Sequence, residues 1–163
     1  MRNEEQIQQA IETYADTVRR ICMLHLKNTS DTEDIFQEVF LKYALSPILF
    51  KNENHEKAWI IRVTINACKD LLKSFFRSHT VSLEEILPVS EEQDESHREV
   101  LEAVLHLPQK YKDAIYLHYF EGYSAVEIGK ILKRKTNTVY TLLDRGRKIL
   151  EKKLGGDEDA GKD

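Results

Sequence analysis

The sequence predicts an all-α protein made of two small helical domains joined by a flexible acidic linker. Glycine and proline are rare, at 6 and 3 among 163 residues, whereas the helix-favouring Leu, Glu and Lys are common. Residues 1–80 carry 11 basic and 11 acidic side chains, residues 81–99 carry one and seven, and residues 100–154 carry 11 and six. We therefore expect helical domains over residues 1–80 and 100–154, an acidic linker over residues 81–99, and a tail over residues 155–163 without fixed structure.

Composition and motifs exclude several classes of protein. No apolar run reaches the ~20 residues of a membrane-spanning helix, and the amino terminus is polar where a signal peptide would be basic and then apolar. The chain has no Gly-rich phosphate loop, no HExxH and no Glu-x-x-His pair, and its six histidines are scattered. Cys22 and Cys68 lie outside any CxxC pattern. We expect a cytoplasmic protein without membrane insertion, with two buried thiols, no metal, no cofactor and no enzyme activity.

A helix is predicted to begin near Ser30, which forms a capping box with Glu33. Its apolar residues recur at helical spacing and form an inward face of Ile35, Phe36, Val39, Phe40 and Tyr43. The outward positions, at i, i+3, i+4 and i+7, are Asp34, Gln37, Glu38 and Leu41. An acidic patch that ends in an exposed leucine suits docking to a basic helical partner, although an ordinary solvated face is the alternative.

A long helix is predicted over the segment HEKAWIIRVTINACKDLLKSFFRSH, residues 55–79. One stripe of this helix, ~22 Å long at 1.5 Å per residue, carries Arg62, Asn66, Lys69, Lys73 and Arg77. The face that packs away from the stripe carries Trp59, Val63, Ala67, Leu71 and Phe75. A cationic stripe with one amide can follow a nucleic-acid backbone while it reads one base; a surface row of solvated cations is the alternative.

The carboxy-terminal domain has the pattern of a helix-turn-helix. Ser124 and Glu127 predict a capping box at the start of a first helix, whose inward residues are Val126, Ile128, Ile131 and Leu132, and Gly129 would let the two helices approach closely. In a second helix, the inward residues are Val139, Leu143, Gly146 and Leu150. The opposite face carries Asn137, Tyr140, Thr141, Asp144 and Lys148, with Arg145 and Arg147 on its flanks. Such a helix fits a DNA major groove about 12 Å wide; a packed pair with a solvated basic face is the alternative.

Three segments together resemble the sigma-70 family of bacterial RNA polymerase sigma factors. DTEDIFQEVFLKY resembles the polymerase-docking helix, KAWIIRVTINACKDLL resembles the promoter-melting segment, and LPQKYKDAIYLHYFEGYSAVEIGKIL with TVYTLLDRGRKIL resembles the carboxy-terminal helix-turn-helix. The intermediate domain of housekeeping sigma factors is absent from this likeness. The chain is therefore similar to the short extracytoplasmic-function, or ECF, sigma factors, over roughly residues 7–154.

The resemblance implies a four-helix carboxy-terminal domain and a role for particular residues. Asp34, Gln37 and Glu38 match residues that dock on the polymerase clamp coiled coil, and Asn66 matches the asparagine near the pocket for a flipped-out minus-ten base, with Arg62, Lys69 and Lys73 as its basic surroundings. Tyr140, Thr141, Asp144 and Arg145 match positions that meet the minus-thirty-five element. Implied partners are core RNA polymerase, through its clamp coiled coil and flap, promoter DNA and an anti-sigma factor.

Three positions depart from the family pattern. Lys133 stands where the turn usually has glycine, Lys135 where a serine usually caps the recognition helix, and Leu142 where arginine is frequent. Thr136 or Asn137 is the alternative cap. The function expected from the whole sequence is that of a non-catalytic transcription initiation factor; the alternatives are a stand-alone helix-turn-helix repressor or activator and an all-helical protein-binding adaptor.

Overall fold

A computed structural model describes residues 1–75 and 95–155, and every regular element in these ranges is helical. The chain divides into two compact units, Met1–Pro88 and Val89–Asp163. The predicted all-α class and the predicted pair of small domains are therefore confirmed. Arg77, residues 81–94 of the predicted linker and residues 156–163 of the predicted tail lie outside the described residues.

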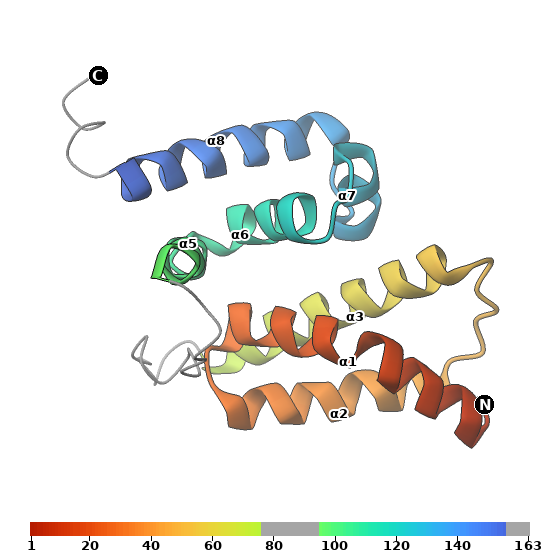
Figure 1. The fold of residues 1–163 in the computed structure, drawn as a ribbon. Helices are drawn as coiled ribbons and strands as arrows, with labels where there is room; N and C mark the ends of the chain where they lie inside the picture. Colours follow the sequence, from red (N-terminus) through yellow and green to blue (C-terminus); the bar gives the residue numbers. More distant parts are fainter. Residues whose placement is uncertain (76–94, 156–163) are drawn as a thin grey trace. The chain divides into compact units, whose positions relative to one another are not determined.

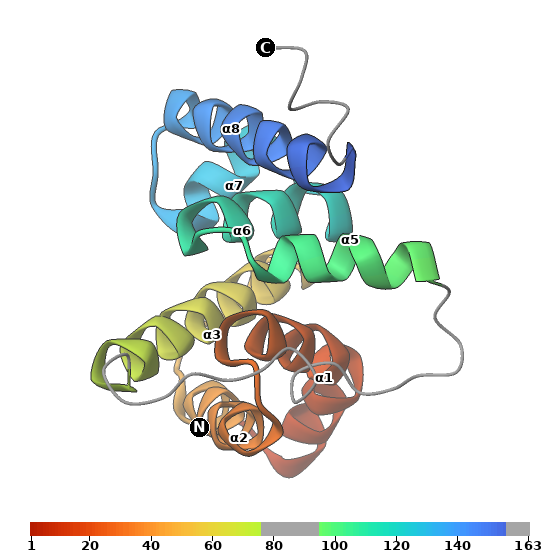
Figure 2. The ribbon, with the colours of Figure 1, turned by 90° about the vertical axis from the view of Figure 1, so that its left-hand side faces the viewer.

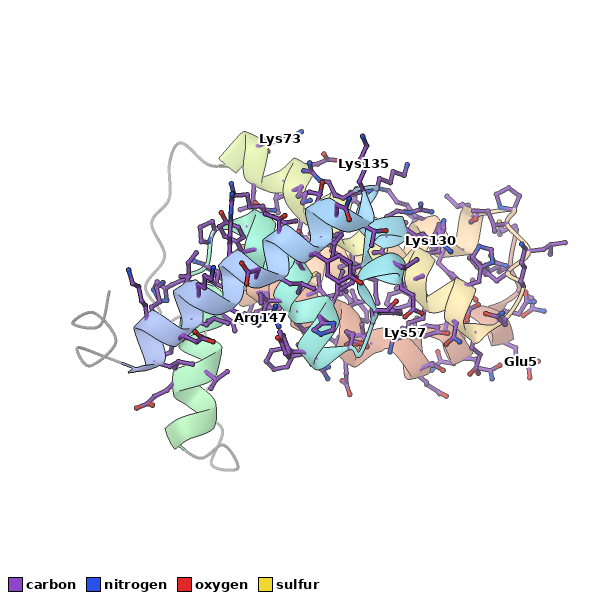
Figure 3. All side chains as sticks on the ribbon, turned by 90° about the horizontal axis from the view of Figure 1, so that it is seen from above. Glu5, Lys57, Lys73, Lys130, Lys135 and Arg147 are labelled. Carbon is purple, nitrogen blue, oxygen red and sulfur yellow. The ribbon has the colours of Figure 1, made fainter. Side chains whose placement is uncertain are left out.

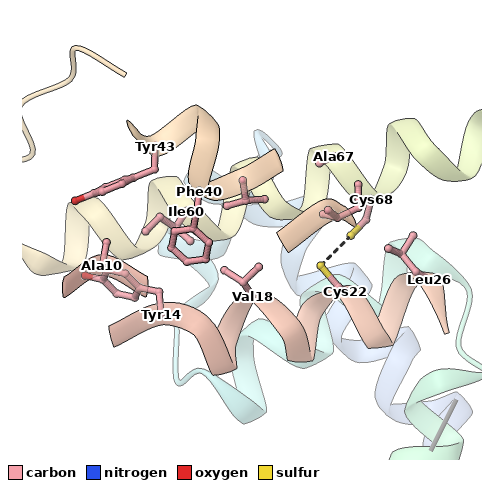
Figure 4. Close-up of a cluster of buried hydrophobic side chains, with 12 residues drawn as sticks. Ala10, Tyr14, Val18, Cys22, Leu26, Phe40, Tyr43, Ile60, Ala67 and Cys68 are labelled. Carbon is pink, nitrogen blue, oxygen red and sulfur yellow. Dashed lines mark hydrogen bonds between the residues drawn. The ribbon is translucent and has the colours of Figure 1, made fainter. Parts of the chain in front are cut away.

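The first unit is a bundle of three helices, α1 (Glu4–Leu26), α2 (Thr29–Leu45) and α3 (Glu53–Phe75). Each helix packs against the other two, as Figures 1 and 2 show in red, orange and yellow-green. Their inward faces form one apolar core, which includes Val18 and Cys22 of α1, Phe40 of α2, and Ile60 and Cys68 of α3 (Figure 4). Both cysteines are buried thiols outside any disulfide, which confirms the expectation for them.

The start of α2 differs from the prediction. Asn28, not Ser30, caps this helix, because the Asn28 side chain accepts a hydrogen bond of 2.7 Å from the backbone amide of Asp31. The predicted capping box of Ser30 and Glu33 is wrong: α2 begins at Thr29, and Glu33 instead receives a hydrogen bond of 3.0 Å from Arg19 of α1. The reason lies one residue earlier, where the left-handed Lys27 ends α1 and lets the chain enter α2 at once.

The second unit contains α5 (Glu95–Leu105), α6 (Gln109–Ile115), a π-helical continuation η1 (Tyr116–Phe120), α7 (Ala125–Leu132) and α8 (Thr136–Gly155). With α6 and η1 counted as one rod, these are the four helices that the resemblance implied. α8 packs on α5, α6 and α7. α5 begins at Glu95, so the helical part of this unit starts five residues before the expected boundary at residue 100.

α7 and α8 form the predicted helix-turn-helix. Ser124 and Glu127 make both hydrogen bonds of the predicted capping box, at 3.2 Å and 2.9 Å. These hydrogen bonds with Ser124 lower the pKa of the Glu127 carboxyl. Ile128 and Ile131 are buried as predicted, but Val126 is 48% exposed, because it lies in the first turn of α7 on the side away from the core. In residues 1–75 and 95–155, no helix has the length and apolar character needed to cross a membrane.

Candidate functional site

α2 presents an exposed face made of the four residues predicted to dock a partner. Asp34, Gln37, Glu38 and Leu41 are all exposed, and Leu41 is 60% exposed. The carboxylate of Glu38 lies 3.6 Å from the ammonium group of Lys42, one turn later. The predicted inward residues lie on the other side of the helix, where Ile35, Val39, Phe40 and Tyr43 are buried.

The apolar end of this face extends beyond Leu41, where the predicted face ended. Leu45 is 59% exposed and lies four residues after Leu41, so the two leucines share one side of α2. That spacing is the signal that would have found Leu45. The face therefore runs from acidic residues at its start to two exposed leucines at its end, which suits a helix carrying both basic and apolar side chains.

Contacts between α1 and α2 hold this face in place. The guanidinium of Arg19 donates to both carboxylate oxygens of Glu33, at 3.0 Å and 3.3 Å, and this pairing raises the pKa of Arg19. The same guanidinium lies 4.1 Å from the ring centroid of Phe36, which in turn packs on Phe40 at 4.8 Å. These contacts fasten α2 to α1 beside the residues that are predicted to dock a partner.

α3 carries the predicted stripe. Asn66 and Lys73 are exposed, and Arg62 and Lys69 are partly buried; Lys73 stands near the end of the helix in Figure 3. The predicted packing residues lie on the other side: Ala67 is buried, and Trp59, Val63 and Leu71 are partly buried against the core. The side chain of Phe75 is outside the described part.

The start of α3 is fixed by a network that sequence reasoning missed. The carboxylate of Glu56 accepts hydrogen bonds from the hydroxyls of Tyr14 on α1, at 2.9 Å, and Tyr43 on α2, at 2.8 Å. Burial, together with these hydrogen bonds to Glu56, raises the pKa of Tyr43 to about 12 and also raises the pKa of Tyr14. One carboxylate thus joins all three helices of the first unit.

Arg2 holds the segment that connects α2 to α3. Its guanidinium donates to the carbonyl oxygen of Ile48 at 2.7 Å, and it lies 4.4 Å from the ring centroid of Tyr43 and 4.9 Å from that of Phe50. Its backbone amide donates to the carbonyl of Ala44. The connection is therefore tied to the amino terminus of the chain.

α8 presents the six residues predicted to meet DNA. Asn137, Tyr140, Thr141, Asp144, Arg145 and Lys148 are all exposed, while Val139, Leu143 and Gly146 on the opposite face are buried. Lys148 lies 3.2 Å from Asp144, and the flanking Arg147 donates to the hydroxyl of Tyr119 at 3.3 Å. Gly146 permits close packing, because a Cβ atom there would lie 2.8 Å from Ile115 of α6.

The turn before α8 is basic and left-handed. Lys133, which stands at the usual glycine position, adopts φ 56° and ψ 50°. Gly129 has no room for a side chain, because a Cβ atom would lie 2.7 Å from the carbonyl oxygen of Arg134. α8 begins at Thr136, so Lys135 holds the cap position, and the alternative caps Thr136 and Asn137 are the first two helical residues. Figure 3 shows Lys130 on α7 and Lys135 at the turn.

No group of three or more His, Cys, Asp or Glu side chains in residues 1–75 and 95–155 has the geometry to hold a metal ion. The exposed face of α2 and the stripe of α3 belong to the first unit, and the exposed face of α8 belongs to the second. The arrangement can bind a helical protein partner and a polyanion through separate surfaces.

Comparisons with known proteins agree with this geometry. The family model Sigma-70 region 2 matches residues 10–77, and the model Sigma-70, region 4 matches residues 97–150. The ECF RNA polymerase sigma factor SigW of Bacillus subtilis is 27% identical over 161 residues, covering 88% of this chain and 86% of SigW. The RNA polymerase sigma factor SigV of the same species is 29% identical over 137 residues, covering 83% of this chain and 82% of SigV.

Solved structures share the fold. The sigma factor RpoE of Bartonella quintana, solved with the anti-sigma factor NepR, superposes with a TM-score of 0.73 at 16% identity, over 94% of this chain and 99% of RpoE. CnrH, solved with the cytosolic domain of CnrY, gives a TM-score of 0.68 at 18% identity, over 94% of this chain and 90% of CnrH. With both sigma-70 regions matched in order, the chain belongs to the sigma-70 family of RNA polymerase sigma factors, in the ECF group.

Proposed function

We propose that this chain is an ECF-type initiation factor with three exposed faces, one that binds polymerase and two that bind promoter DNA. It binds core RNA polymerase, directs it to specific promoters and promotes DNA opening. The observation that carries the proposal is that the two matched sigma-70 regions each expose polar faces, on α2 and α3 in one and on α8 in the other. It acts by binding and has no catalytic chemistry of its own, and it works in the cytoplasm with the polymerase.

The face of α2 docks on the clamp coiled coil. Asp34 and Glu38 supply negative charge for a basic partner helix, Gln37 supplies an amide, and Leu41 with Leu45 supplies apolar contact. Exposure of all five side chains on one side of one helix supports this assignment.

The stripe of α3 captures the non-template strand at the minus-ten element. Arg62, Lys69 and Lys73 attract phosphate, and Asn66 pairs with the edge of one flipped base. An amide offers both a donor and an acceptor, whereas the cationic side chains are donors only. The support is that Asn66 is exposed between the partly buried Arg62 and Lys69, on a helix whose start is hydrogen-bonded to α1 and α2 through Glu56.

The exposed face of α8 reads the minus-thirty-five element. Tyr140, Thr141 and Asp144 meet base edges in the major groove. The remaining proposed contacts, which position the helix on phosphate and sugar, are Asn137, Arg145 and Lys148. Further proposed partners are the polymerase flap and an anti-sigma factor.

A gel-shift assay on promoter DNA, with and without core polymerase, tests the function. We expect specific binding that depends on core polymerase and a permanganate-reactive bubble in that complex. Tight specific binding without polymerase would instead identify a stand-alone helix-turn-helix regulator. Binding to polymerase or another protein, with no effect on DNA, would identify an adaptor.

A further inference from the structure

The chain's only two cysteines meet in the core of the first unit. Cys22 on α1 and Cys68 on α3 are 46 residues apart in sequence, yet the thiol of Cys68 donates to the sulfur of Cys22 across 3.9 Å. Both cysteines are 0% exposed, and both are thiols that form no disulfide in this structure. Figure 4 shows the two sulfur atoms facing each other between the helices.

The separation is within reach of a covalent bond. A disulfide has an S–S length of about 2.05 Å, so the sulfur atoms must approach by about 1.9 Å. Rotation about the single Cα–Cβ bond of each cysteine moves its sulfur relative to the backbone. Ala67, in the same core cluster, has only a small side chain. A rotation of the side chains with a slight approach of α1 and α3 can supply this movement.

We propose that Cys22 and Cys68 are an oxidation site at which a peroxide joins α1 to α3 and thereby impairs promoter opening. One thiolate attacks the peroxide O–O bond, forming a sulfenic acid and releasing water or an alcohol. The second thiol then attacks the sulfenic sulfur and releases water. Two thiols lose two electrons and two protons in total, and the peroxide accepts them, so the reaction balances.

Burial sets the rate of this reaction. A thiol without solvent exposure reacts with a peroxide only when the packing between α1 and α3 opens locally. Oxidation is therefore slower than that of an exposed thiol, and it accelerates under conditions that loosen the first unit without unfolding it. Because the chain has no third cysteine, every intramolecular disulfide must be this one.

The consequence for function rests on the proposed role of α3. Cys68 lies two residues after Asn66 and one before Lys69, so a pull on Cys68 toward α1 displaces the proposed base-capture residue. α2 carries no cysteine, so its docking face stays available. We expect the amount of open complex to fall about fivefold, which corresponds to the loss of one hydrogen bond to a base. Polymerase binding should change less than about twofold.

The test compares reduced and peroxide-treated full-length protein. Alkylation in denaturant followed by intact mass counts free thiols: we expect two in the reduced protein and none in the treated protein, which remains monomeric. Polymerase co-purification and permanganate footprinting then measure docking and opening, and a dithiol reductant should restore opening. Cys22→Ala and Cys68→Ala are the controls. Neither variant can form the intramolecular disulfide, so peroxide treatment should not reduce promoter opening by either.

Two results would overturn the proposal. In one, the thiols stay free or form only intermolecular disulfides or sulfonic acids; in the other, the disulfide forms but opening is unchanged. A reduced protein that binds polymerase without opening DNA would instead contradict the proposed function, so the two failures are distinguishable. Because the main comparison uses one protein before and after oxidation, it does not depend on how the variants fold.

Discussion

The ammonium nitrogen of Lys148 lies 3.2 Å from a carboxylate oxygen of Asp144, one turn earlier on the exposed face of α8. The two side chains are 72% and 55% exposed, so this ion pair contributes at most about 0.5 kcal/mol to stability. A DNA phosphate that binds Lys148 would leave Asp144 free to accept a hydrogen bond from a base edge. The pair connects the proposed phosphate contact to the proposed base contact.

Lys148→Ala should weaken promoter binding to a similar degree on all promoters. Loss of one phosphate contact should lower the slope of log affinity against log salt by about one unit. Tyr140→Ala is the contrasting variant, and it should change which minus-thirty-five sequences are preferred. A selection over randomised minus-thirty-five elements at several salt concentrations measures both. An unchanged preference for Tyr140→Ala would show that α8 does not read bases through this face.

Glu38→Lys should abolish co-purification with core polymerase while the chain stays folded. The substitution places a cation opposite a basic partner helix and also beside Lys42, which now lies 3.6 Å from the Glu38 carboxylate. Glu12→Lys, an exposed glutamate on α1, is the matched control with the same change of charge. Circular dichroism should be the same for both variants. Polymerase binding by folded Glu38→Lys at the parent level would refute the docking face.

Lys133→Gly should raise the free energy of unfolding by about 1 kcal/mol. Lys133 has φ 56°, a backbone conformation that costs free energy for a residue with a Cβ atom. Lys130→Gly removes the same charge from the interior of α7 and should lower the free energy of unfolding by about 1 kcal/mol. Urea unfolding of the two full-length variants checks the opposite signs, and a destabilised Lys133→Gly would argue against the left-handed turn.

The free energy of unfolding should fall at high pH because of Tyr14 and Tyr43. Burial, together with the Glu56 hydrogen bond, raises the pKa of Tyr43 from 10.0 to about 12, so the folded state holds the phenol proton more tightly than the unfolded chain. This stabilisation is complete below about pH 10 and is lost as the pH rises through about 12.

Glu56→Gln removes the negative charge beside the two hydroxyls, which is one cause of these raised pKa values, and leaves the other cause, burial, in place. Phenolate absorbance and urea unfolding, followed from about pH 9 to about pH 12, should therefore show ionisation and loss of stability at lower pH than in the parent. Identical titrations of the parent and the variant would show that Glu56 does not bind the two hydroxyls.

Local signals in the sequence predicted the helices and their exposed faces. The capping box of Ser124 and Glu127 depends on residues three apart, and the faces of α2, α3 and α8 follow from helical spacing alone. The start of α2 was misplaced because Asn28 and Ser30 are both good caps, and the choice depends on where α1 ends at Lys27.

Contacts between distant segments left no local pattern. Glu56 lies 42 residues from Tyr14, and Cys22 lies 46 residues from Cys68, so neither contact can be read before the three helices are placed. Periodicity assigned Val126 to the inward face of α7, but Val126 lies on the side of α7 that faces away from the core, whereas its neighbour Ala125 is buried. The roles of the exposed residues came from family resemblance, and their exposure is what the structure adds.

Asn66→Ala, assayed by permanganate footprinting across single-base variants of the minus-ten element, is the decisive test of base capture by α3. Asn54→Ala, which changes an exposed asparagine in the first turn of α3, is the matched control. The double variant Lys69→Ala with Lys73→Ala is the contrast, and it should lose DNA affinity in a salt-sensitive way with little change in base preference. We expect Asn66→Ala to keep polymerase binding and closed complex but to form much less open complex. A pre-melted minus-ten region should not fully rescue this variant, because base capture is missing. If Asn66→Ala opens DNA like the parent and keeps its base preference, Asn66 is an ordinary surface amide and the proposed role of α3 is wrong.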